Sequence, residues 1–173
     1  MYLLLGAIFM VLAFMAYQDF KFRGIYWWLF PLLFFGLLTY CSMLTGWHSV
    51  YSAAAFNAVF LLAQVVFLTL YISVKKGRLT NIFNGFFGLG DLLFLCCATC
   101  CFSVSNYIFF YILSLFLTIA VTLVFKFFRS EVKDKIPLAG YQAVLLIVVM
   151  LADRVQGGWH MFSDVMLPDF TGL

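Results

Sequence analysis

Two aspartates stand at the ends of apolar stretches, where an acidic side chain could do chemistry. Asp19 ends the first stretch, and Asp91 opens a later one directly after Gly88-Leu89-Gly90. Two carboxyls that approach each other at a poorly solvated site cannot both ionise easily, so they share a proton. Such a pair suits aspartyl-protease chemistry, because the ionised partner activates water and the protonated partner donates to the scissile carbonyl or leaving amine. This chemistry needs no metal.

The cysteines form a second candidate cluster. Four of them, Cys96, Cys97, Cys100 and Cys101, include a C-x-x-C spacing inside one apolar stretch, and Cys41 lies in another. Metal ligation needs thiolates, which are costly in lipid, and cysteine otherwise behaves as a small hydrophobic residue. We therefore expect these side chains to pack, and we predict neither a metal nor another cofactor.

The composition indicates which environment surrounds the segments that position these residues. The chain has 173 residues, of which 66% are hydrophobic and 10% charged, and its mean hydropathy is +1.09. Soluble domains average roughly 45–50% apolar and about 25% charged residues. The sequence therefore predicts an integral membrane protein with the lipid bilayer as partner. It leaves no room for an appended soluble or nucleic-acid-binding unit.

Apolar runs separated by charged or turn residues predict about six transmembrane spans. Since lipid cannot satisfy open strand edges, the spans must be helices, which makes the fold an all-α polytopic membrane bundle. Residues 1–152 would form the membrane domain and residues 153–173 a non-cytoplasmic tail. Gln64 and Gln142 fall within spans, where hydrogen bonds between helices are expected. The predicted spans are residues 2 to 17, 25 to 44, 50 to 74, 88 to 104, 107 to 128 and 137 to 152.

The basic residues predict the orientation. Nine of the ten follow the first, third and fifth spans: Lys21, Arg23, Lys75, Lys76, Arg78, Lys126, Arg129, Lys133 and Lys135. The positive-inside rule places these loops in the cytoplasm and both termini outside. We accordingly expect a multi-pass protein of the cytoplasmic (inner) membrane. Asp19 and Asp91 would then share one depth, just inside the cytoplasmic face, where an ionisable group marks a candidate site.

Each aspartate also has an ordinary explanation. Asp19, with Lys21 and Arg23 nearby, could be one of the charges that are common at span ends. Asp91 could cap the N-terminus of its own helix, because Asp is among the preferred N-cap residues. The distance between them in sequence does not show that they meet.

Three motifs in order resemble the type IV prepilin peptidases, which are GxGD aspartyl proteases of the membrane. They are Asp19 followed by Arg23 and Ile25, the Gly88-Leu89-Gly90-Asp91 segment, and Ile136-Pro137-Leu138-Ala139-Gly140 opening the last span. The resemblance covers essentially the whole chain in span number, orientation and motif order. It implies a short, protease-only form, without the zinc-binding cysteine segment and methyltransferase function of the larger enzymes.

The resemblance also implies roles for particular residues. Asp19 and Asp91 would be the catalytic pair of a metal-independent aspartic endopeptidase. Gly88 and Gly90 would allow close backbone packing around Asp91, and Pro137 would start a helix beside the site. The implied substrate is a type IV prepilin-like protein of pilus or secretion systems, whose short basic leader is removed at the cytoplasmic face.

Two departures from the family pattern keep other functions open. Tyr26 and Trp27 replace the usual Pro-Asn after Ile25, and Leu93 replaces a frequent lysine. A non-catalytic subunit or degenerate homologue that binds hydrophobic helices during pilus or secretion assembly is therefore the alternative. A small proton-coupled transporter using the same acids is a third hypothesis, although no span is conspicuously broken at the midplane.

Overall fold

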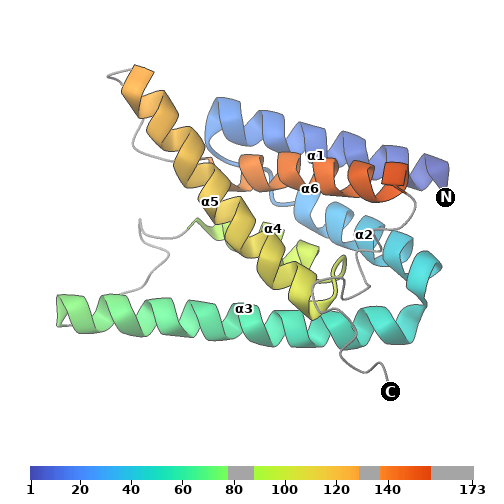
Figure 1. Ribbon diagram of the computed structural model, residues 1–173, viewed down its shortest axis with the longest axis horizontal. Helices are drawn as coiled ribbons and strands as arrows, with labels where there is room; N and C mark the ends of the chain where they lie inside the picture. The colour runs from blue at the N-terminus through green and yellow to red at the C-terminus, as the bar shows by residue number, and fades with distance from the viewer. Residues whose placement is uncertain (78–87, 129–136, 157–173) are drawn as a thin grey trace.

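Six α-helices make up the regular structure of the part of the chain that the computed structural model describes (Figure 1). It describes residues 1–77, 88–128 and 137–156, with the backbone alone for residues 125–128 and 155–156. All regular structure in these residues is helical, so the predicted all-α fold is confirmed for them. In chain order the helices are α1 (Tyr2–Phe22), α2 (Leu29–Thr45), α3 (Trp47–Lys76), α4 (Leu89–Ala98), α5 (Val104–Phe128) and α6 (Leu138–Gln156).

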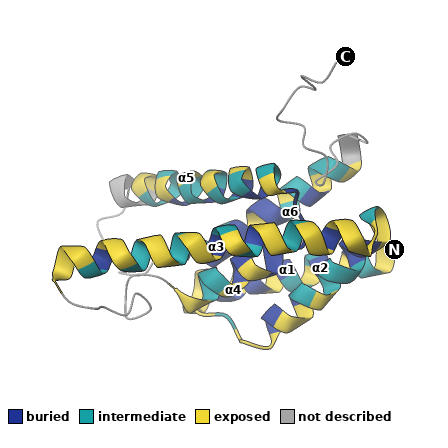
Figure 2. Ribbon diagram, turned by 90° about the horizontal axis from the view of Figure 1, so that it is seen from below, coloured by how far each residue is buried: buried dark blue, intermediate teal, exposed yellow. Residues whose placement is uncertain are grey.

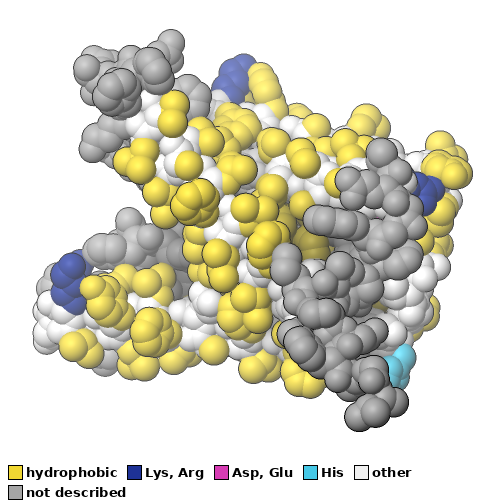
Figure 3. Space-filling model, in the orientation of Figure 1, with side chains coloured by type: hydrophobic (Ala, Val, Ile, Leu, Met, Phe, Trp, Pro, Cys, Tyr) yellow, Lys and Arg dark blue, Asp and Glu magenta, His cyan; other side chains and the backbone are white. Residues whose placement is uncertain are grey.

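Three helices are long and apolar enough to cross a membrane: Tyr2–Phe22, Trp47–Lys76 and Val104–Val124. Helix α3 buries only four of its 30 residues, most of the remainder is exposed, and most of the exposed side chains are apolar (Figure 2). Hydrophobic side chains are spread across the described part of the face shown in Figure 3, where few charged side chains lie among them. Such a surface is suited to lipid, which supports the prediction of a membrane protein.

Helices α1, α2, α4 and α6 form the centre of the bundle. Helix α1 lies along α6 and α2, and α4 rests against α2 and α6. Helix α5 crosses obliquely and contacts α6 and α3 (Figure 1). The core is filled by large apolar side chains, which include Leu12, Met15, Leu33, Leu37, Phe94, Leu95 and Leu146.

The predicted fourth span, residues 88 to 104, is wrong in length. Helix α4 has 10 residues, which gives about 15 Å against a hydrocarbon core of about 30 Å. Residues 99–103 leave the helix although they are largely apolar, and all of them are buried. Apolarity predicted burial here, but it did not predict where the helix ends.

Side chains from neighbouring helices explain how α4 can end inside the protein. The Asn57 amide of α3 donates to the carbonyls of Thr99 at 3.0 Å and Phe102 at 2.9 Å. The Tyr107 hydroxyl of α5 donates to the Leu95 carbonyl at 3.1 Å. Irregular backbone at membrane depth is tolerated where protein satisfies its polar groups.

The other boundaries differ from the predicted spans by a few residues. Helix α1 continues past residue 17 to Phe22, so Asp19 lies inside a helix and not after it. Helix α6 continues past residue 152 to Gln156. The predicted tail beyond residue 156 and the basic residues Arg78, Arg129, Lys133 and Lys135 lie outside the described residues.

Candidate active site

The first turn of α6 brings both aspartates together. The Pro137 carbonyl accepts the Tyr141 N–H at 3.3 Å, which starts the helical hydrogen bonding. The first N–H groups of a helix have no partner within it. Asp91 Oδ1 accepts the Ala139 N–H at 2.8 Å, and Asp19 Oδ2 accepts the Gly140 N–H at 2.6 Å. Carboxyls from α1 and α4 therefore meet at adjacent residues of a third helix.

The electrostatic surroundings of this pair combine attraction and repulsion. The N-terminus of a helix carries partial positive charge, which favours a carboxylate beside it. The Arg23 charge also attracts Asp19, whereas the charges of Asp19 and Asp91 repel each other. Asp19 is only 7% exposed, so water screens these interactions weakly. A pair in this position is suited to holding one shared proton.

The end of α1 holds Asp19 toward α6. Arg23 terminates α1 in the left-handed conformation, at φ 58°, and its N–H donates to the Asp19 carbonyl at 3.0 Å. Gln18, which is buried, accepts the Tyr26 N–H at 3.1 Å. These two hydrogen bonds fasten the α1–α2 turn and leave the Asp19 side chain directed at α6.

Gly140 permits the close approach of α1 to α6. A Cβ at this position would lie 3.1 Å from Asp19 Oδ2 and 3.2 Å from Phe20 Cε1, tighter than most real contacts. One residue on, the ring of Tyr141 packs edge-to-face on Phe20 with centroids 5.0 Å apart. Gly140 belongs to the motif that opens the last span, but the sequence predicted no role of its own for it. The available signal was a small-residue pair, Ala139-Gly140, at the start of a span.

The start of α4 positions Asp91. Gly88 is the N-cap, and a Cβ on it would lie 2.5 Å from Asp91 Oδ2, so the carboxyl needs a glycine there. Asp91 also accepts the Gly88 backbone N–H, as the acidic residue of a capping box does. It therefore serves the N-termini of both α4 and α6. Gly90 is less restrictive, because its Cβ would meet Phe30 at an ordinary 3.8 Å.

The cysteines lie apart from this arrangement. Cys97, Cys100 and Cys101 are buried, and the Cys97 thiol donates to the Phe30 carbonyl at 3.3 Å. Cys96 is exposed. Within the described residues no three histidine, cysteine or acidic side chains are grouped to hold a metal ion. The buried cysteines pack as small residues at the end of α4.

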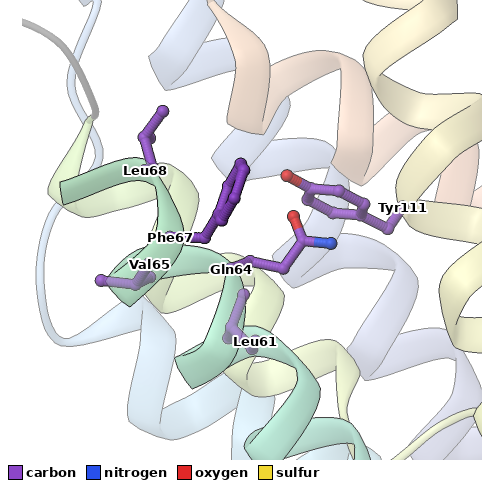
Figure 4. A pocket seen from close by; sticks show the side chains of 6 residues that line it. All are labelled: Leu61, Gln64, Val65, Phe67, Leu68 and Tyr111. Atoms are coloured by element: carbon purple, nitrogen blue, oxygen red, sulfur yellow. The ribbon is translucent and has the colours of Figure 1, made fainter. Parts of the chain in front are cut away.

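The two glutamines within the predicted spans have different surroundings. The Gln142 amide donates to the Ser114 hydroxyl at 3.4 Å, which links α6 to α5 as expected for a polar residue in a span. Gln64 lines a pocket of about 110 Å³ between α3 and α5, together with Leu61, Val65, Phe67, Leu68 and Tyr111 (Figure 4). Neither aspartate lines this pocket, so the candidate site is defined by the hydrogen bonds at α6.

Comparisons with known proteins found no relative of this chain. No protein-family model matches the chain, and neither a curated protein nor a solved structure matches it.

Proposed function

We propose that this protein is an intramembrane aspartyl endopeptidase that removes the short basic leader of type IV prepilin-like proteins at the cytoplasmic membrane face. One observation carries the proposal. Asp19 and Asp91, 72 residues apart in sequence, hydrogen-bond to the adjacent N–H groups of Gly140 and Ala139. This brings together the two carboxyls that aspartyl-protease chemistry requires.

The pair would act through one shared proton. The ionised carboxylate takes a proton from a water molecule, whose oxygen attacks the scissile carbonyl. The protonated carboxyl donates its proton to the developing oxyanion. The C–N bond then breaks as the proton taken from water passes to the leaving amine, and a hydroxyl of the intermediate returns a proton to the carboxyl that donated. The N–H groups of Ala139 and Gly140 hold both carboxyls in place during these transfers.

The surface beside Asp91 suits a hydrophobic substrate. Leu89 is 59% exposed and Leu93 42% exposed, and they lie one turn apart on α4. A substrate helix could pack on these side chains while its leader reaches the carboxyls from the cytoplasm. Leu93 stands where the family often has lysine, so apolar contact would replace a charged one here.

The same hydrogen bonds also favour a second candidate function. Each aspartate caps an N–H of α6, and a capping side chain is worth about 0.5–2 kcal/mol of stability. A non-catalytic homologue that binds hydrophobic helices would keep these caps for their structural value. An experiment must therefore separate capping from proton transfer.

Asparagine substitutions make this separation, because Asn also caps helices but cannot transfer the proton. We expect Asp19→Asn and Asp91→Asn each to abolish cleavage of a co-expressed prepilin-like substrate, while thermal stability changes by less than about 1 kcal/mol. The double variant should be little worse than either one, since members of one catalytic unit are non-additive. EDTA should have no effect.

Asp153→Asn, at the far end of α6, is the matched control and should cleave normally. Cleavage by either single variant of the pair would contradict the dyad, and inhibition by EDTA would indicate a metal. A wild-type protein that binds the substrate helix but never cleaves it would favour the non-catalytic function.

A further inference from the structure

A row of hydroxyls on α5 faces the protein interior. Ser114, Thr118 and Thr122 are spaced four residues apart, and the first two are 1% and 4% exposed. Each hydroxyl donates to a backbone carbonyl one turn earlier, at 2.8, 2.8 and 2.7 Å. Because the single proton of each hydroxyl is used, its oxygen remains available only as an acceptor.

Gln142 on α6 contacts Ser114 of this row. Its amide nitrogen donates to the Ser114 hydroxyl at 3.4 Å, and the residue is completely buried. Its amide oxygen, Oε1, is buried and has no hydrogen-bond partner in the part of the chain that the structure describes. A buried acceptor without a donor costs folding free energy, so we expect a ligand that donates a hydrogen bond to this oxygen.

The chemistry of the cluster selects a small, neutral donor. The oxygens of Gln142, Ser114 and Thr118 all accept and carry no formal charge. Water brings two O–H donors and can bridge two acceptors, which is the usual role of ordered water among buried polar groups. Gln142 and Ser114 are 0% and 1% exposed, so the donor must be small enough to reach fully buried atoms.

The position of the cluster links it to the candidate active site. Gln142 follows Ala139 by three residues, so it lies about one turn along α6 from the N–H groups that hold the aspartates. Hydrolysis consumes one water molecule at the carboxyls, and Asp19 is only 7% exposed, so water needs a route to the pair. Thr118 and Thr122 continue the row of acceptors along α5 toward its C-terminal end.

From this geometry we infer that Gln142, Ser114 and Thr118 bind water between α5 and α6 and deliver it to Asp19 and Asp91. The inference rests on the proposed function for the delivery, and on the buried acceptors for the binding. Gln142 would therefore position the water and would not itself react.

Radiolytic footprinting tests the binding without any need for catalysis. X-rays generate hydroxyl radicals from water in place, and a cysteine next to bound water is oxidised. In the full chain with its native cysteines replaced by alanine, Ser114→Cys should be oxidised readily. The control Phe116→Cys, on the lipid-facing side of α5 and 70% exposed there, should not.

Adding Gln142→Leu to Ser114→Cys removes the acceptor and should lower oxidation to the Phe116→Cys level. Oxidation of Tyr107, which is 0% exposed, should stay low in the same samples, which shows that the fold is kept. Oxidation of Ser114→Cys no faster than Phe116→Cys, or insensitive to Gln142→Leu, would overturn the water site.

Cleavage assays test the delivery. Gln142→Leu in the otherwise native chain should cleave about tenfold more slowly, the effect of roughly one hydrogen bond, without a change in KM. Unchanged cleavage together with lost oxidation would overturn delivery. If the native chain cleaves nothing, the proposed function fails, and the footprinting result still decides whether water is bound.

Discussion

At the residue scale, Asp19 and Asp91 have a structural role that does not depend on any reaction. Each satisfies one N–H of the first turn of α6, and Asp91 also serves the start of α4. Unsatisfied N–H groups at a helix end are costly in a low-dielectric interior. Substitution of either residue by alanine therefore confounds stability with chemistry, and the asparagine variants are the informative ones.

Gly140 and Gly90 form a matched pair for testing how closely Asp19 must be held. Gly140→Ala places a methyl group 3.1 Å from Asp19 Oδ2 and should push the carboxylate from the N–H. A misplacement of about 1 Å can cost on the order of 100-fold in rate, so we expect a loss of about 10- to 100-fold in kcat/KM.

Gly90→Ala is the control, because its methyl group meets only Phe30 at 3.8 Å. It should cleave at nearly the wild-type rate, and both variants should purify as folded protein. Equal activity of Gly140→Ala and Gly90→Ala would show that the position of Asp19 is not critical to the reaction.

Helix α4 shows at the element scale how a short helix is accommodated inside the bundle. Asn57 donates to two carbonyls of the segment that follows α4. Asn57→Ala would leave both without this donor, so we expect destabilisation by about 1–3 kcal/mol. Thermal or denaturant unfolding in detergent measures it.

Ser52→Ala provides the comparison on the same helix. Ser52 is exposed, and its hydroxyl donates to the Ser49 carbonyl one turn earlier. This substitution should change stability by less than about 0.5 kcal/mol. Equal stability of Asn57→Ala and Ser52→Ala would mean that the Asn57 hydrogen bonds do not hold the end of α4.

The cysteines of α4 and the following turn should be separable from the chemistry. Cys96 begins five residues after Asp91, about 7–8 Å further along the helix. Replacing Cys96, Cys97, Cys100 and Cys101 by alanine or serine should leave cleavage largely intact, with a modest loss of yield because three are buried. A folded but inactive quadruple variant would show that the cluster participates in function.

The whole molecule has an orientation that its basic residues predict. Lys75 and His48 lie near opposite ends of α3, separated by 27 residues or about 40 Å of helix. In a chain without native cysteines, Lys75→Cys should react with an impermeant thiol reagent only from the cytoplasm, and His48→Cys only from outside. Labelling from the opposite sides would remove the cytoplasmic location proposed for Asp19 and Asp91.

The sequence by itself determined the all-helical architecture and suggested lipid as the solvent. These properties depend on composition and on the length of apolar runs, which local sequence records directly. It also singled out Asp19 and Asp91, because acidic side chains are conspicuous where nearly everything else is apolar.

Only the tertiary structure decided where α4 ends and what holds the aspartates. The helix stops at Ala98, and just beyond its end the Thr99 carbonyl accepts a hydrogen bond from Asn57, 42 residues before Thr99 in the chain. The aspartates meet through backbone N–H groups, and every non-proline residue carries such a group. Side-chain identity therefore cannot mark Ala139 and Gly140 as partners, and only the packing of α1 and α4 against α6 selects them.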